Sequence, residues 1–145
     1  MSSVVTAFDL GVPLETARVF GRDGPLVLEV GFGNGEFLEY LAGTHADWNI
    51  LAADTSPSCV VRARKRMARG GFSNVRLYCG DARYIVRNVT PRSSLHRVYV
   101  NFPDPWPRRR HARRRLMGKD FLTLLASRLG DDGALWLTTD HPEYF

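Results

Sequence analysis

The chain has 145 residues, a formal net charge of +5 and 44% hydrophobic residues, which suits one domain with a real core and excludes global disorder. No apolar run is long enough to span a bilayer, and the N-terminus lacks the basic start and long apolar stretch of a signal peptide. The two cysteines, Cys59 and Cys79, have neither metal-site nor disulfide-framework spacing, so we expect a cytoplasmic protein with reduced thiols, no metal and no membrane partner.

The first predicted elements are an arm, a strand, a turn and a helix. Residues before Gly24 are weakly periodic and predict an arm or short helix, so we place an N-terminal arm at 1–24 and the domain at 25–145. The apolar run Leu26–Val30 predicts a buried strand. A glycine-rich turn follows, and the apolar spacing from Phe37 predicts a helix.

The same cycle then repeats. Residues 48–54 predict a second strand, which ends on an acid. The next segment predicts a helix with Ser56 as its cap, Pro57 in its first turn and the glycine pair 70–71 at its end. Residues 74–82 predict a third strand and its turn.

The rest of the chain places helices around two more strands. We expect a short helix at 82–88, a fourth strand at 95–102, a helix that stops near Gly130, and a fifth strand at 134–140. Strands that alternate with helices form right-handed crossovers. The sequence therefore predicts an α/β fold with a doubly wound, mostly parallel sheet.

Polar and glycine-rich residues follow each predicted strand. In doubly wound sheets, ligands bind at the carboxyl ends of the strands, where the strand order reverses. The residues at these positions are Gly31–Gly35, Asp54, Gly80, Asp81, Asn101–Trp106 and Thr138–Asp140. Their convergence predicts one shared site.

The glycine-rich turn differs from a typical dinucleotide-binding turn. It reads G-x-G-x-G over residues 31–35, and Glu36 stands where the third glycine of G-x-G-x-x-G belongs. The glycines allow the backbone to approach a bulky neutral or cationic ligand closely, although a simple tight turn also accounts for them. A nicotinamide dinucleotide is therefore a poorer match.

Three acids complete the cofactor prediction. Glu29 is costly to bury inside a strand unless it meets a cation or a supporting network. Asp54 follows the second strand, where a carboxylate usually accepts hydrogen bonds from both ribose hydroxyls. We expect Asp81 to reach an adenine amino group. With the glycine turn, these acids make S-adenosylmethionine the favoured cofactor.

Two clusters of basic residues lie in the chain. The first, Arg62, Arg64, Lys65, Arg66 and Arg69, is explained equally well by a solvated helix face and by a function. The second has six arginines between 108 and 115, with almost no nearby acid. Arginine binds phosphate through two parallel hydrogen bonds and stacks on bases. The second cluster therefore predicts an anionic partner such as nucleic acid.

A stiff turn precedes the second cluster. Three prolines surround Asp104 and Trp106, and each proline fixes its own φ. Trp106 is either a packing anchor or a surface on which a base stacks. A carboxylate at Asp104 can hold the N1 and N2 donors of a guanine and favour the positive charge that develops as N7 is methylated. Guanine N7 has a free lone pair, so positioning supplies most of the catalysis.

Four segments resemble the tRNA (guanine-N7)-methyltransferases: LVLEVGFGNGEFL, NVRLYCGDA, VNFPDPWPRRRHARRRL and LWLTTDHPEY. The resemblance runs from about Phe20 to Tyr144, and the F-P-D-P-W segment with its basic stretch is specific. It implies a Rossmann-like class I methyltransferase fold. It also implies methyl transfer from S-adenosylmethionine to N7 of a guanine in the tRNA variable region, by a monomer or homodimer.

The resemblance also implies roles for individual residues. Its catalytic aspartate is Asp104. The implied cofactor contacts are Glu29, Gly31, Gly33, Gly35, Asp54, Asp81 and Asp104. The implied substrate and RNA contacts are Arg108, Arg110, His111, Arg113, Arg114, Arg115 and Asp140, to which we add Trp106.

The chain departs from the family pattern in three places. Pro107 and Arg108 stand where histidine and lysine are common, and Asp54 stands where a longer glutamate is usual. The family continues past Phe145 with a helix and two strands that include a Thr-x-x-Glu substrate motif. We therefore expect a fragment or a trimmed homologue, whose sheet lacks the last helix and strand hairpin and has an exposed edge after Asp140.

Two alternatives stay open beside this reading. Base-amino methyltransferases that act on adenine or cytosine have an Asn/Asp-Pro-Pro-aromatic turn after the fourth strand, which the separated prolines after Asn101 match loosely. A non-catalytic RNA-binding homologue fits the short C-terminal part, although every acid of the expected site is present. A nicotinamide-dependent dehydrogenase is the weakest candidate, because no catalytic acid or tyrosine–lysine pair is evident.

Overall fold

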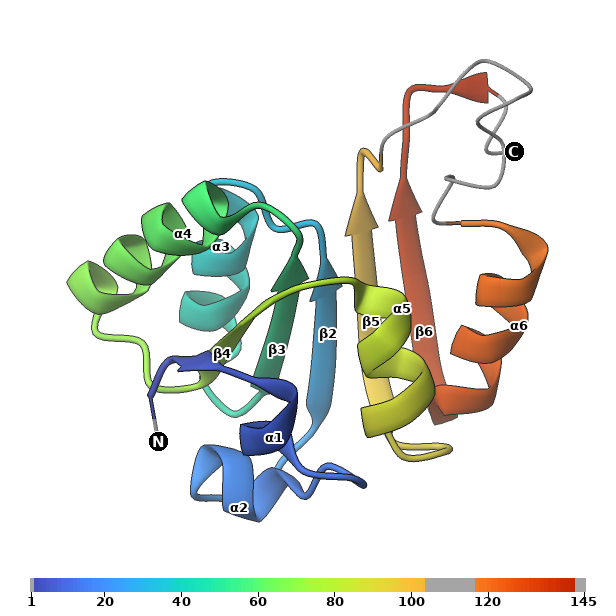
Figure 1. Cartoon of the computed structure of the whole chain (residues 1–145), viewed down its shortest axis with the longest axis horizontal. Helices are drawn as coiled ribbons and strands as arrows, with labels where there is room; N and C mark the ends of the chain where they lie inside the picture. The colour runs from blue at the N-terminus through green and yellow to red at the C-terminus, as the bar shows by residue number, and fades with distance from the viewer. Residues whose placement is uncertain (1, 104–116, 143–145) are drawn as a thin grey trace.

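The computed structural model describes residues 2–103 and 117–142. Within these residues, six parallel strands form one sheet in the order β1-β4-β3-β2-β5-β6 (Figure 1). The strands are β1 (Val4–Val5), β2 (Leu26–Val30), β3 (Asn49–Asp54), β4 (Val75–Cys79), β5 (Leu95–Asn101) and β6 (Leu129–Thr138). The chain winds outward from β2 in both directions, so the predicted doubly wound α/β fold is confirmed and the strand order reverses between β2 and β5.

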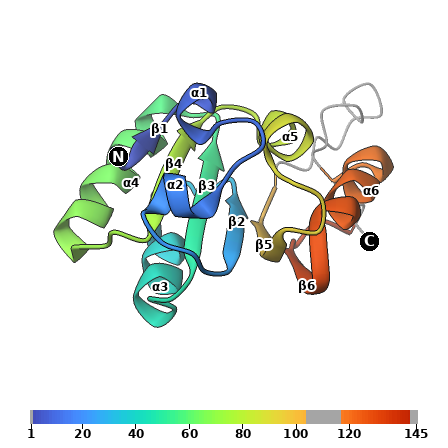
Figure 2. The same cartoon turned by 90° about the horizontal axis from the view of Figure 1, so that it is seen from below.

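Helices cover both faces of the sheet. They are α1 (Ala7–Leu10), α2 (Thr16–Phe20), α3 (Glu36–Thr44), α4 (Pro57–Gly70), α5 (Ala82–Tyr84), the π-helical turn η1 (Ile85–Val89) and α6 (Lys119–Arg128). One core contains buried residues of α3 and α4, and the other contains buried residues of α1, α2, α5, η1 and α6. Figure 2 shows α3 on one side of the sheet and α1 and α5 on the other. None of the helices described is long and apolar enough to cross a membrane.

Local sequence signals account for the helix termini. The hydroxyl of Ser56 accepts a hydrogen bond from the Cys59 N–H, with Pro57 in the first turn, as predicted for α4. The helix ends before Gly71, which has a left-handed conformation with φ 69°. The short helix predicted at 82–88 is also present, as α5 followed by η1.

The number of strands predicted from the sequence was wrong. The N-terminal segment contributes a sixth strand, in which Val4 and Val5 pair with Leu77 and Tyr78 of β4. A two-residue strand has no measurable alternation, so only pairing with β4 defines it. The helices α1 and α2 of the same segment bury side chains such as Leu10 in the core beneath the sheet.

The last strand also begins earlier than predicted. It starts at Leu129 instead of residue 134, and ends at Thr138 instead of Asp140. Leu129 pairs with Leu95, and the register then shifts before Ala134 pairs with Arg97. Residues 130–133, whose Gly-Asp-Asp-Gly composition is typical of a turn, lie in this irregularity and have no paired residue in β5.

Candidate functional site

The predicted site residues that the structure describes follow the carboxyl ends of the strands. β2 leads into the glycine-rich turn 31–35, β3 ends at Asp54, and β4 leads to Asp81. All strands are parallel, so these ends share the upper edge of the sheet in Figure 1. The edge lies at the point where the strand order reverses, beside β5, which is where ligands bind in such sheets.

Hydrogen bonds donated by backbone N–H groups join these strand ends directly. The Gly33 N–H donates to Oδ2 of Asp54 over 2.9 Å. The Gly31 N–H donates to the Ala53 carbonyl over 2.7 Å, and the Gly80 N–H donates to the Asp54 carbonyl over 2.9 Å. The glycine turn, the end of β3 and the end of β4 therefore form one connected unit.

The three glycines of the turn serve different purposes. All have positive φ, at 73° for Gly31, 56° for Gly33 and 85° for Gly35. A Cβ at Gly31 or Gly33 would meet no atom within 4 Å, so open space adjoins the backbone there. A Cβ at Gly35 would lie 3.1 Å from the Cβ of Ala63 in α4. Gly35 thus permits close packing of α3 on α4, while Gly31 and Gly33 leave room beside the backbone.

This difference predicts unequal costs for two matched substitutions. Gly31→Ala loses about 1 kcal/mol of stability, because only the left-handed backbone opposes the added methyl group. Gly35→Ala loses roughly 2–4 kcal/mol, because the methyl group also presses against Ala63. Urea unfolding of both variants measures the difference, and equal losses would refute the packing role of Gly35.

Asp54 has a structural role that sequence reasoning did not identify. Its Oδ2 accepts the hydrogen bond from Gly33, and its Oδ1 accepts one from the Ser56 N–H over 2.9 Å. The carboxylate thereby fixes the glycine turn to the start of α4. Each carboxylate oxygen has a further lone pair, so the predicted acceptance from ribose hydroxyls remains compatible with this arrangement.

Glu29 is the most unusual side chain of the site. It is 2% exposed in the middle of the sheet, and its Oε2 has no hydrogen-bond partner among the described residues. Burial first, and then the nearby charge of Asp54, raise the pKa of Glu29 to about 8. A buried carboxylate without a partner is costly, so this position favours either a proton or a cationic or donor group of a ligand.

Asp81 is held by its own helix. Its carboxylate accepts a hydrogen bond from the Arg83 N–H at 2.8 Å and pairs with the Arg83 guanidinium, the closest contact being 2.8 Å. The side-chain hydrogen bond from Arg83 is the main reason that the pKa of Asp81 is lowered. The sequence placed Asp81 correctly after β4 but did not reveal Arg83 as its partner.

The substrate-side predictions fall largely outside the described residues. These are Asp104, Trp106, Arg108, Arg110, His111, Arg113, Arg114 and Arg115. Just before this segment, the Phe102 N–H donates a hydrogen bond to the Thr138 carbonyl of β6 over 2.6 Å. Asp140 follows β6 at the same edge of the sheet and is exposed.

Known proteins resemble this chain in sequence and in fold. A family model described as "Putative methyltransferase" matches residues 23–145. A tRNA (guanine-N(7)-)-methyltransferase of Thermus thermophilus is 50% identical over 92% of the chain and 43% of the relative. The enzyme of the same name from Thermotoga maritima is 40% identical over 97% of the chain and 47% of the relative. The chain thus spans less than half the length of these relatives.

Solved structures agree with the fold. TrmN of Thermus thermophilus matches with a TM-score of 0.67 at 24% identity, over 89% of this chain and 37% of that one. An antibiotic-related methyltransferase matches with a TM-score of 0.66 at 17% identity, over 93% of this chain and 70% of that one. At such identities, the likeness establishes the fold alone. It confirms the predicted Rossmann-like class I arrangement.

Proposed function

Because this chain belongs to the methyltransferase family whose model spans residues 23–145, we propose that it transfers a methyl group from S-adenosylmethionine to N7 of a guanine in tRNA. The names of the sequence relatives support the substrate and the reaction. The observation that carries the cofactor assignment is the buried Oε2 of Glu29, which has no partner among the described residues and lies two residues before the open glycine turn.

The residues at the strand ends fit the proposed cofactor. S-adenosylmethionine, when bound, supplies an activated methyl group on a positively charged sulfur. The buried Glu29 carboxyl group offers an unused acceptor and, when ionised, a negative charge, and the backbone beside Gly31 and Gly33 is open. Asp54 and Asp81 offer acceptors for hydroxyl and amino donors. With Gly35 shaping the turn, these are the residues that we propose hold the cofactor.

The substrate side of the proposal rests on the sequence. Asp104 holds the guanine and is the proposed catalytic residue, and it also contacts the cofactor. The proposed tRNA contacts are Trp106, Arg108, Arg110, His111, Arg113, Arg114, Arg115 and Asp140. We propose that the protein acts in the cytoplasm, as a monomer or a homodimer.

One experiment tests the reaction and separates it from the alternatives. The protein is incubated with labelled S-adenosylmethionine and unmodified tRNA, and the nucleosides are identified by mass spectrometry. We expect the label on 7-methylguanosine. Label on N6-methyladenosine would favour a base-amino methyltransferase instead, and bound tRNA without label would favour the non-catalytic RNA-binding protein.

A further inference from the structure

We propose that the exposed basic face of α4 is a second RNA-binding surface, which contacts the phosphate backbone of the tRNA. This inference rests on the proposed function and adds a surface separate from the arginines of residues 108–115. The "α4 face" is formed by four basic residues at helical spacing, namely Arg62, Lys65, Arg66 and Arg69.

The charge of α4 is one-sided. Five basic residues lie between positions 62 and 69, and the whole helix contains no aspartate or glutamate. Solvated helix faces usually alternate positive and negative residues at spacings of three and four, and like charges at these spacings destabilise a helix. The favourable interaction of a last-turn cation with the helix dipole accounts for Arg69 but not for Arg62 or Lys65.

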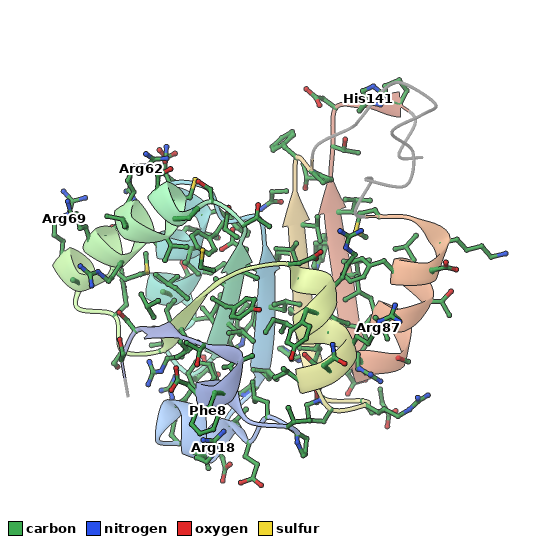
Figure 3. All side chains as sticks on the ribbon, viewed as in Figure 1. Phe8, Arg18, Arg62, Arg69, Arg87 and His141 are labelled. Atoms are coloured by element: carbon green, nitrogen blue, oxygen red, sulfur yellow. The ribbon has the colours of Figure 1, made fainter. Side chains whose placement is uncertain are left out.

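Most basic side chains of the α4 face form no ion pair with the described residues. Of the four basic residues of the α4 face, only Arg66 has a carboxylate of the described residues within 4.0 Å, which is that of Glu39 at 2.6 Å. Lys65 and Arg69 are exposed, and Arg62 and Arg69 extend outward from α4 at the margin of the molecule (Figure 3). The charges of Arg62, Lys65 and Arg69 are therefore not neutralised by a carboxylate of the described residues, and a large anionic partner can approach them.

The α4 face is also hollowed. A surface groove of about 520 Å³ is lined by Asn34, Arg62, Lys65, Arg66, Ala68 and Arg69. The cations from Arg62 to Arg69 extend over about 10 Å of the helix, at about 1.5 Å per residue. An array of this length, rich in arginine, suits the repeating phosphates of a nucleic acid better than a single small anion.

The α4 face is continuous with the candidate site. Arg62 donates from Nε to the Asn34 side-chain oxygen over 2.7 Å, and Arg66 donates from Nε to the Asn34 carbonyl over 3.2 Å. Asn34 lies between Gly33 and Gly35 in the turn after β2. An RNA backbone on the α4 face would therefore lie directly beside the glycine turn, at the same edge as the rest of the site.

Salt-dependent binding of unmodified tRNA tests the proposal. The double variant Lys65→Gln/Arg69→Gln removes two charges and leaves both contacts to Asn34 intact. We expect the slope of log K against log salt to fall in magnitude by roughly 2, and the affinity to fall several-fold at moderate salt. The matched control, Arg87→Gln/Arg92→Gln, removes two exposed charges, of which Arg87 lies away from α4 in Figure 3, and keeps the wild-type slope.

Binding and methyl transfer are measured separately on the same preparations. If the Lys65/Arg69 variant keeps the slope of the control while the wild type methylates guanine, the inference fails and the proposed function stands. If the wild type transfers no methyl group but the two variants differ in slope as expected, the proposed function fails and the inference stands. A wild type that binds no tRNA overturns the inference as well.

Discussion

We expect Glu29→Gln to prevent the fall in the free energy of unfolding that the wild-type protein shows as the pH rises. The raised pKa of Glu29 means that, between about pH 4.5 and 8, the folded state binds a proton that the unfolded state has released. The free energy of unfolding of the wild type therefore falls as the pH rises through this window and levels off above it. Glutamine has the shape of the protonated acid and does not titrate. The free energy of unfolding of the variant therefore does not fall with pH in this way.

The effect is large because the group is buried. From pH 5 to pH 8, we expect the free energy of unfolding of the variant, relative to the wild type, to rise by on the order of 4 kcal/mol. Urea unfolding at several pH values measures it. Glu36→Gln, at the exposed start of α3, is the matched control and follows the wild type. Parallel pH profiles of the Glu29 variant and the wild type would show that Glu29 is not held protonated by the fold.

The same substitution separates stability from cofactor binding. If the Glu29 carboxylate contacts the cofactor, Glu29→Gln weakens binding of S-adenosylmethionine at least about tenfold, because hydrogen bonds to charged groups contribute about 1.5–3 kcal/mol. Isothermal titration at about pH 9, above the pKa of about 8 at which the Glu29 carboxyl of the folded protein releases its proton, measures the affinity. An unchanged affinity alongside the expected pH profile would make Glu29 a structural acid only.

The central strands could be predicted from the sequence because burial on both faces leaves them uniformly apolar. Leu26–Val30 is buried at every position and is bounded by Pro25 and Gly31, so its limits agree with the prediction. The edge strands could not be predicted in the same way. β1 has two residues, and β6 begins with Leu129 because Leu95 pairs with it.

The positions of the site residues could be predicted, but not all of their partners. Asp54 and Asp81 follow strands that a parallel sheet must bring to one edge, which the sequence pattern already indicates. That Asp54 holds the Gly33 backbone, and that Arg83 holds Asp81, depends on side-chain geometry that exists only after folding. The absence of a described partner for Glu29 Oε2 is likewise a property of the packed core.

Asp104→Ala abolishes methyl transfer and leaves tRNA affinity nearly intact. Each of the three prolines around Asp104 in the sequence restricts its own φ and lacks a backbone N–H, so we expect a stiff segment with few backbone donors. In the proposed mechanism, the Asp104 carboxylate holds the guanine by its N1 and N2 donors and stabilises the charge that develops on the ring. Loss of one preorganised electrostatic group of this kind typically costs about 100-fold to 1,000-fold in rate.

Single-turnover transfer and tRNA binding, measured on the same variant, test this role. Asp131→Ala removes one exposed carboxylate from β6 and is the control for net charge, and it keeps the wild-type rate. Asp104→Asn retains one acceptor oxygen without the charge, so its rate should fall between those of the wild type and Asp104→Ala. Wild-type turnover in Asp104→Ala would remove Asp104 from the mechanism. Loss of tRNA binding would instead show that Asp104 serves mainly to bind the tRNA, because a residue that acts chiefly on the developing charge affects the rate much more than the affinity.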